Sequence, residues 1–257
     1  MIDDFSQRAG CALVTGGTGG LGEAVCRMLA ERGSDVALTY NKNATKASAL
    51  VDELTALGRR AQAWSVDLVD ETATADFVAA AADAFGGVHT FVHAAGPHIP
   101  QVHLSRVPPA QFAANLAGEA MGFYNVVHPL LPLLRETQGN IVAITTAATR
   151  RYPVRDGLSS GTKGSVEAVV RALAAEEGRF GIRANCVGPG MMTDGMAQRL
   201  MASGDLDDAA LDITRRNIPL RRFGDAADIA EAVCFLASDR ADFISGQMLD
   251  VDGAYGV

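Results

Sequence analysis

The sequence has few cysteines, no long apolar run and no excess of positive charge. The four cysteines among its 257 residues (Cys11, Cys26, Cys186 and Cys234) are scattered without CxxC spacing. We therefore expect reduced, mostly buried thiols and no metal site. The N-terminus is acidic and lacks the apolar segment of a signal peptide, and no apolar run approaches the ~20 residues that span a bilayer. These absences predict a cytoplasmic protein with no membrane segment.

The charge balance narrows the class of partner. The formal net charge is −8, which argues against general affinity for nucleic acid or anionic membrane. It does not exclude an anionic cofactor held locally. With 48% hydrophobic and 20% charged residues, the chain can fill a sizeable core, and its length suits one large α/β domain. We interpret residues 1–257 as a single domain.

Short apolar segments alternate with longer amphipathic ones along the chain. We expect strands at 12–17, 35–40, 61–68, 89–96, 140–145, 182–190 and 246–254. We expect helices at 21–33, 44–58, 71–86, about 109–135, 159–178 and 225–238, the last with Asp225 as its N-cap. Seven strands alternating with six main helices predict an α/β fold, a doubly wound parallel sheet of the Rossmann type with helices on both faces. The polar, irregular segment 191–220 has two marginal helical patches and is predicted to be a substrate lid.

The segment TGGTGGLG at 15–22 follows an expected strand and opens an expected helix. In that context, Gly16, Gly20 and Gly22 allow a tight turn and the close approach of a pyrophosphate. The helix N-terminus adds free N–H groups and the positive end of its dipole. A glycine-rich turn without a ligand is the alternative, and the spacing is TGxxxGxG rather than GxGxxG.

Several motifs resemble the short-chain dehydrogenase/reductase family over nearly the whole chain. Besides TGGTGGLG, these are VDL at 66–68, HAAG at 93–96, the asparagine of NLAG at 115, NCVGPG at 185–190 and the C-terminal segment from RRFGD to VDGA. The resemblance implies a nicotinamide dinucleotide cofactor. It says much less about the substrate.

The end of the second expected strand bears on the choice of cofactor. An acidic residue there hydrogen-bonds the ribose 2′-OH of NAD, whereas basic or small polar residues accommodate the 2′-phosphate of NADP. Tyr40 occupies that position here, followed by Asn41 and Lys42, so no carboxylate repels a phosphate. Thr18 of the glycine turn, where a basic residue would favour the phosphate, leaves NAD(H) possible. NADP(H) is favoured. The predicted cofactor-binding residues are Gly16, Thr18, Gly20, Leu21, Gly22, Tyr40, Asn41, Lys42, Asp67, Leu68, Ala94, Ala95, Gly96, Lys163, Pro189, Gly190, Met192 and Thr193.

The expected active site departs from the family pattern. The resemblance implies a cooperating Asn, Ser, Tyr and Lys, and the corresponding residues here are Asn115, Thr146, Ser159 and Lys163. Thr146 keeps a hydroxyl that could polarise a carbonyl. Ser159 stands at the tyrosine position, and an aliphatic alcohol is a far weaker acid than a phenol and shorter in reach. Ala94 stands where the second Asn of the family's NNAG motif would be. Lys163 can still hold the nicotinamide ribose.

Four hypotheses follow for the chemistry. First, another group donates the proton, the candidates being Tyr152, His98 and His103. Second, the substrate needs no strong acid, as in the 2,4-dienoyl-CoA reductase branch, where a Ser also precedes the Lys. Third, the protein binds cofactor without catalysis, as a sensor or partner subunit. Fourth, Thr146 and a bound water sustain slow ketoreduction.

We expect an NAD(P)(H)-dependent oxidoreductase acting on a carbonyl or enoyl/dienoyl small-molecule substrate with a non-standard proton donor. A catalytically silent relative is the alternative. The resemblance also implies a homotetramer or homodimer, with the long helices and the C-terminal segment at the interfaces.

Overall fold

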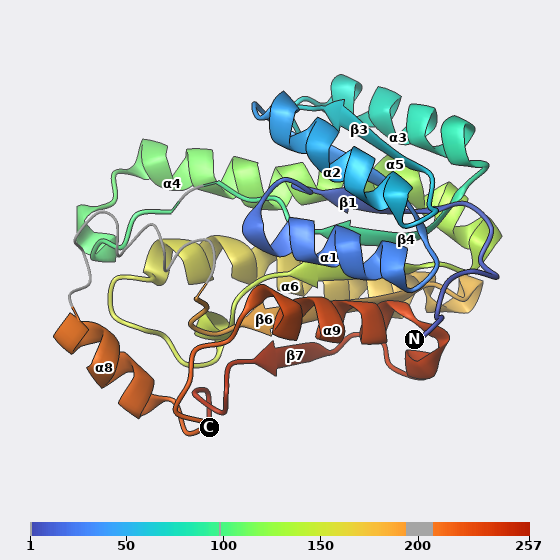
Figure 1. Cartoon of the computed structure of the whole chain (residues 1–257). Coiled ribbons are helices and arrows are strands. Elements are labelled where there is room, and N and C mark those ends of the chain that lie inside the picture. Colours follow the sequence, from blue (N-terminus) through green and yellow to red (C-terminus); the bar gives the residue numbers. More distant parts are fainter. Residues whose placement is uncertain (1, 98, 194–207) are drawn as a thin grey trace.

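All strands of this computed structural model lie in one parallel sheet (Figure 1). The structure describes residues 2–97, 99–193 and 208–257. The seven strands lie in the order β3-β2-β1-β4-β5-β6-β7. They are β1 (Cys11–Thr15), β2 (Asp35–Tyr40), β3 (Ala61–Ser65), β4 (Val88–His93), β5 (Asn140–Ile144), β6 (Arg183–Pro189) and β7 (Met248–Val251). The predicted fold class is confirmed.

The helices connect successive strands. They are α1 (Gly20–Glu31), α2 (Ala44–Ala56), α3 (Glu71–Phe85), α4 (Pro109–Leu116), α5 (Gly122–Thr137), α6 (Gly157–Glu177), α8 (Asp208–Asn217) and α9 (Ala226–Ala237). Asp225 caps α9 as predicted: its carboxylate accepts a hydrogen bond from Asp228 N at 3.0 Å, and the Asp228 carboxylate accepts one from Asp225 N at 3.0 Å. This reciprocal capping box satisfies two N–H groups that the helix leaves unpaired.

The prediction of a single helix at 109–135 is wrong in one respect. A π-helical turn at Ala117–Met121 separates α4 from α5. Gly118 lies within the turn and Gly122 directly follows it, and each allows a neighbouring group to approach closely. A Cβ at Gly118 would lie 3.3 Å from the Pro97 ring, and one at Gly122 would lie 3.4 Å from Leu68 Cβ. A π-helical turn holds one residue more than an α-helical turn, and this leaves the pattern of apolar residues nearly unchanged. The sequence therefore predicted an unbroken helix.

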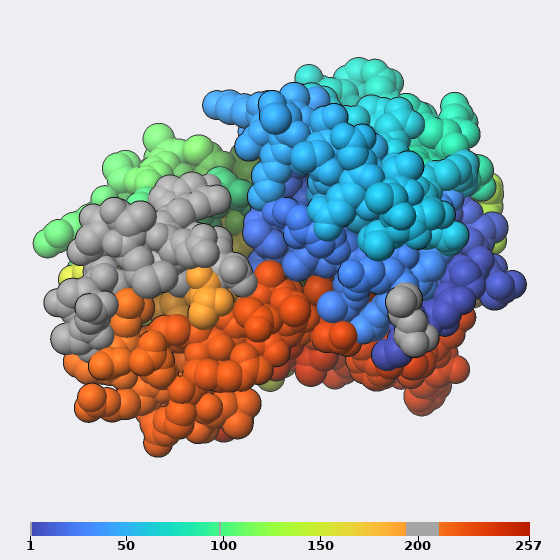
Figure 2. Space-filling view, in the orientation of Figure 1, coloured from blue at the N-terminus to red at the C-terminus, as the bar shows by residue number. Residues whose placement is uncertain are grey.

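Apolar side chains cover both faces of the sheet. On one face, α1, α2 and α9 pack through residues such as Val25, Leu29, Leu54 and Val233. On the other face, α3, α5 and α6 pack through residues such as Phe77, Phe123 and Val170. The central strands are therefore buried on both sides: every residue of β1, β4 and β5 is buried, and most of these residues are apolar. In the space-filling view, the N-terminal segments in blue meet the C-terminal segments in orange along one face (Figure 2).

The strand order places a topological switch at β1. Its neighbours are β2 and β4, so the chain winds in opposite directions from this point. Ligands of such sheets bind outside the carboxyl ends of the strands at the switch. The glycine turn follows β1, and the segment 94–96 follows β4. The fold therefore brings these two predicted segments together.

Part of the predicted lid, residues 194–207, lies outside the described residues. Within the remainder of 191–220, α8 accounts for one helical patch, and Met192 pairs with Gly224 in an isolated bridge. A role as a lid stays a prediction. Among the described residues, no helix has the length and apolar character needed to cross a membrane.

Candidate active site

The glycine turn after β1 fits tightly against its surroundings. Gly16 has a φ of +68°, and a Cβ there would lie 2.7 Å from Ala95 Cα. A Cβ at Gly22 would lie 2.2 Å from the Gly16 carbonyl oxygen. Only glycine fits at either position. Gly19 is the N-cap of α1 and has no side chain to cap the helix, so the first N–H groups of the helix receive no side-chain acceptor. These features fit the anion site that the sequence predicts for this turn, and its role in binding stays a prediction.

The end of β2 is open and carries no carboxylate. Tyr40 is half-buried, whereas Asn41 and Lys42 are exposed. Asn43 caps α2, with its side chain accepting a hydrogen bond from Lys46 N at 3.0 Å. The ammonium of Lys46 is paired with Glu23 at 2.5 Å. Lys42 has no ion-pair partner among the described residues, so its charge remains available to a ligand.

The predicted residues after β3 and β4 lie along the same edge of the sheet. Asp67 is exposed, and its Oδ1 accepts a hydrogen bond from Val69 N at 3.1 Å in a local turn. The backbone N of Ala94 donates to the Thr15 carbonyl at 3.2 Å, which ties the end of β4 to the end of β1. Gly96 is exposed. The backbone around Ala94–Gly96 thus forms the second wall beside the glycine turn.

His93, the first residue of HAAG, is buried and neutral. Its Nδ1 lies 2.9 Å from Thr15 Oγ1, and its ring packs edge-on against Phe123 at 5.3 Å. Its Nε2 has no hydrogen-bond partner among residues 2–97, 99–193 and 208–257. Burial, with a smaller contribution from the Lys163 ammonium, lowers the pKa of His93 to about 3. His93 therefore supports the strands rather than acting as an acid or base near neutral pH.

The predicted catalytic residues come from three separate elements. Asn115 is buried in α4, and its Nδ2 donates to the Gln111 carbonyl at 3.0 Å. Thr146 follows β5, and its Oγ1 accepts from Ala148 N at 3.2 Å. Ser159 is buried on the first turns of α6, one turn before Lys163. The Ser159 Oγ makes no hydrogen bond with any described group, so it is free for a ligand.

Glu119 joins this group although the sequence did not suggest it. Its Oε2 lies 3.0 Å from Lys163 Nζ, and its side chain is 2% exposed against 16% for Lys163. The only signal in the sequence is one acidic residue in the otherwise small and apolar segment NLAGEAMG, four residues after Asn115. Which side chain it meets depends on how α4, the π-helical turn and α6 pack together.

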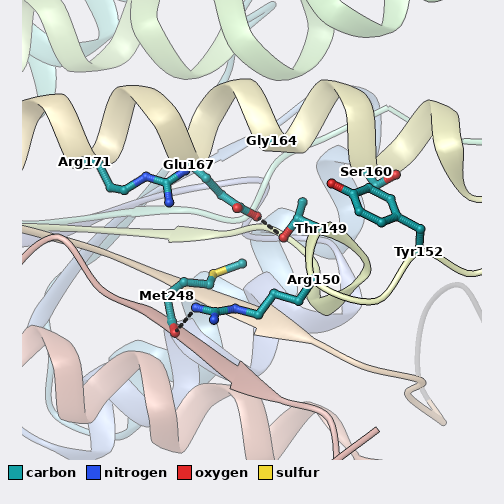
Figure 3. A pocket seen from close by; sticks show the side chains of 8 residues that line it. All are labelled: Thr149, Arg150, Tyr152, Ser160, Gly164, Glu167, Arg171 and Met248. Atoms are coloured by element: carbon teal, nitrogen blue, oxygen red, sulfur yellow. Dashed lines mark hydrogen bonds between the residues drawn. The ribbon is translucent and has the colours of Figure 1, made fainter. Parts of the chain in front are cut away.

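Tyr152 lies in the loop before α6, beside a different face of that helix from the one that carries Ser159 and Lys163. It is 69% exposed and lines a cavity of about 380 Å³ with Thr149, Ser160, Gly164 and Glu167 (Figure 3). Ser160 and Gly164 each follow Ser159 and Lys163 by one position, which turns them roughly 100° around the helix. A role for Tyr152 as the proton donor stays a prediction. His98 lies outside the described residues, and His103 is an exposed residue before a short 3₁₀ turn.

The predicted cofactor-binding residues at the end of β6 and just after it pack against the C-terminal part of the chain. Pro189 is the last residue of β6, and Gly190 packs so tightly that a Cβ would lie 2.7 Å from Asp252 Cα. Met192 is buried, and Thr193 N donates to the Gly224 carbonyl at 2.8 Å.

A family model described as enoyl-(acyl carrier protein) reductase matches residues 16–256. The chain belongs to the short-chain dehydrogenase/reductase family. It is 32% identical over 243 residues to 3-oxoacyl-[acyl-carrier-protein] reductase FabG of Staphylococcus epidermidis, covering 94% of this chain and 97% of the relative. It is 29% identical to versicolorin reductase 1 of Dothistroma septosporum, covering 98% of both chains. This short-chain dehydrogenase/reductase is therefore an oxidoreductase by family.

Solved structures of the family agree with this fold. A short-chain dehydrogenase from Burkholderia cenocepacia in complex with NADP has a TM-score of 0.88 at 30% identity, covering 98% of this chain and 100% of the other. A 7α-hydroxysteroid dehydrogenase complexed with NADH and 7-oxo glycochenodeoxycholic acid has a TM-score of 0.89 at 26% identity, covering 98% and 96%. The two relatives bind different nicotinamide cofactors.

Proposed function

We propose that this protein is an NAD(P)(H)-dependent reductase that prefers NADP(H) and protonates its product without a tyrosine at position 159. The observation that carries the proposal is the glycine turn after β1, pressed against Ala95 at the topological switch. Uncapped N–H groups at α1 and the absence of side chains at Gly16, Gly17 and Gly19 fit a pyrophosphate. A bound nicotinamide cofactor would supply or accept the hydride.

The preference for NADP(H) rests on the end of β2. The exposed Lys42 has no ion-pair partner among the described residues, whereas nearby Lys46 is held by Glu23. A 2′-phosphate would bring two negative charges. The Lys42 ammonium attracts them, and position 40 carries a tyrosine rather than a carboxylate that would repel them. We expect Lys42→Ala to weaken NADPH binding and to leave NADH binding unchanged, as measured by the fluorescence of the reduced nicotinamide.

The chemistry at the reacting centre rests on Ser159 and Lys163. Ser159 presents a buried, unpaired hydroxyl in place of the family's phenol, and Thr146 presents a second hydroxyl after β5. Neither alcohol is acidic enough to be an efficient proton donor near neutral pH. A carbonyl or enoyl substrate would thus be polarised by hydroxyl groups, with the proton supplied by water or by a residue such as Tyr152 or His103. Turnover of NADPH with a panel of 3-ketoacyl, enoyl and dienoyl thioesters tests this proposal.

The alternative function is a catalytically silent cofactor-binding protein acting as a sensor or partner subunit. The buried Ser159 favours this alternative, because α6 contains no tyrosine whose phenol could lie beside Lys163. Binding of NADPH with no turnover of any thioester supports this alternative. Strong ketoreductase activity in Ser159→Tyr, with none in the wild type, would indicate a site that has lost its ordinary acid.

Assembly into a homotetramer or homodimer belongs to the proposal as well. Large apolar side chains are exposed on α5 and near β7, namely Tyr124, Leu249 and the fully exposed Phe243. Such side chains favour contact with another copy of the chain.

A further inference from the structure

Glu119 is a buried carboxylate with only one of its two oxygens satisfied. Oε2 accepts a hydrogen bond from Lys163 Nζ at 3.0 Å, whereas Oε1 is buried and has no hydrogen-bond partner in the part of the chain that the structure describes. Leaving a buried acceptor of a charged group unpaired is unfavourable, and most buried polar atoms in folded proteins have a partner. The free oxygen therefore indicates a partner that binds from outside the chain.

The position of Oε1 shows where that partner would lie. A Cβ built on Gly96 would be 2.7 Å from Oε1, so the oxygen lies directly against this exposed glycine. Gly96 follows β4 at the carboxyl edge of the sheet, next to the switch point. The unpaired oxygen thus borders the predicted cofactor site.

The backbone around Glu119 is shaped to place it there. Glu119 is the central residue of the π-helical turn Ala117–Met121. Such turns are rare and frequently occur at functional sites. Gly118, the residue before it, packs against the Pro97 ring just beyond Gly96. This contact holds the turn close to the end of β4.

The charge of the pair limits the chemistry of the partner. A carboxylate bound to an ammonium accepts hydrogen bonds and donates none. The partner must therefore present a hydroxyl or an N–H, and a phosphate is excluded by repulsion. Lys163 donates from the same place, which suits a sugar with adjacent hydroxyls that can both donate and accept.

We propose that Glu119 is a cofactor-binding residue whose Oε1 accepts a hydrogen bond from a hydroxyl of the nicotinamide ribose, while its Oε2 fixes the Lys163 ammonium beside the same ribose. This inference rests on the proposed function.

The test compares two ligands by isothermal titration calorimetry. NADPH carries the nicotinamide ribose, and adenosine 2′-phosphate 5′-diphosphate lacks it. We expect Glu119→Gln and Glu119→Ala to weaken NADPH binding by roughly tenfold or more, the value of a hydrogen bond to a charged group. The fragment should bind each variant within about twofold of the wild type, which also shows that the variant is folded.

Glu167→Gln is the matched control. Glu167 is another buried glutamate, but it lies on α6 with its carboxylate 2.9 Å from Thr149 Oγ1, in the cavity that Tyr152 lines. Substitution of Glu167 should change neither the affinity for NADPH nor the affinity for adenosine 2′-phosphate 5′-diphosphate. Lys163→Met should weaken NADPH binding as well, and its effect should be less than additive with that of Glu119→Gln because the two residues hold one ribose.

Three outcomes overturn the inference. If both Glu119 variants bind NADPH as tightly as the wild type, the proposed function stands and Glu119 has no part in cofactor binding. If NADPH and the fragment lose affinity equally, Glu119 supports the fold of the site and does not contact the ribose. If the wild type binds neither NADPH nor NADH, the proposed function fails and the inference fails with it.

Discussion

Acid should destabilise this protein because two buried histidines must be protonated. His93, which has the lower pKa of the two, is the residue to test first. Burial lowers the pKa of His93 to about 3 and that of His89 to about 4. In the unfolded chain each histidine titrates near its ordinary pKa of about 6.5. Between these values the unfolded state binds a proton that the folded state does not, so stability falls as the pH falls from about 6.5 towards 3.

At pH 5 the loss in the free energy of unfolding is set almost entirely by protonation of the histidines in the unfolded chain. The folded pKa of His93 lies well below 5, so lowering the pH from 7 to 5 should cost about 2 kcal/mol for this residue alone. His89 should contribute a similar about 2 kcal/mol over the same interval. The substitution His93→Asn removes the titrating group and keeps an amide that can reach Thr15.

The assay is urea-induced unfolding at pH 7 and pH 5, at one protein concentration. Between pH 7 and pH 5, the free energy of unfolding of His93→Asn should fall by about 2 kcal/mol less than that of the wild type. This difference should hold even if the variant is less stable at both pH values. His128→Asn is the control, because His128 is exposed on α5, and its loss should match that of the wild type. Equal losses in His93→Asn and the wild type would refute the reasoning and show that His93 is protonated in the folded protein or unburied.

Two further predictions concern the glycine turn and the cysteines. Gly22→Ala would place a Cβ 2.2 Å from a backbone oxygen, so the turn must shift, and we expect calorimetry to show NADPH affinity lower by roughly tenfold or more. Gly178→Ala, where a Cβ meets nothing within 4 Å, should bind normally, and normal binding by Gly22→Ala would contradict the role of the turn. All four cysteines are free and buried, and burial raises the pKa of Cys11, Cys186 and Cys234 to about 12. A disulfide reagent such as dithionitrobenzoate should therefore label all four thiols only after unfolding, and rapid labelling of the native protein would show that a thiol is accessible.

The sequence by itself determined the order and type of the main elements. The apolar run at 35–40 coincides with β2, and Asp225 caps α9 as its spacing predicted, because strands and helix ends depend on neighbouring residues. The glycine turn was also predictable. Its tight packing requires the absence of side chains at Gly16 and Gly22, and an absent side chain is visible in the sequence. The free, buried cysteines agree with the expectation from their spacing.

Only the tertiary structure decided what surrounds Lys163. Glu119 lies 44 residues before Lys163 in the chain, and the pair forms because a π-helical turn and α6 pack together. The turn itself adds one residue to a helix whose apolar pattern looks continuous, so no local signal marks it. Tyr152 is close to Ser159 in sequence, yet it lines a cavity with Ser160 and Glu167, which lie on a different face of α6 from Ser159. Contacts of this kind depend on the packing of whole elements, which residue spacing along one segment does not specify.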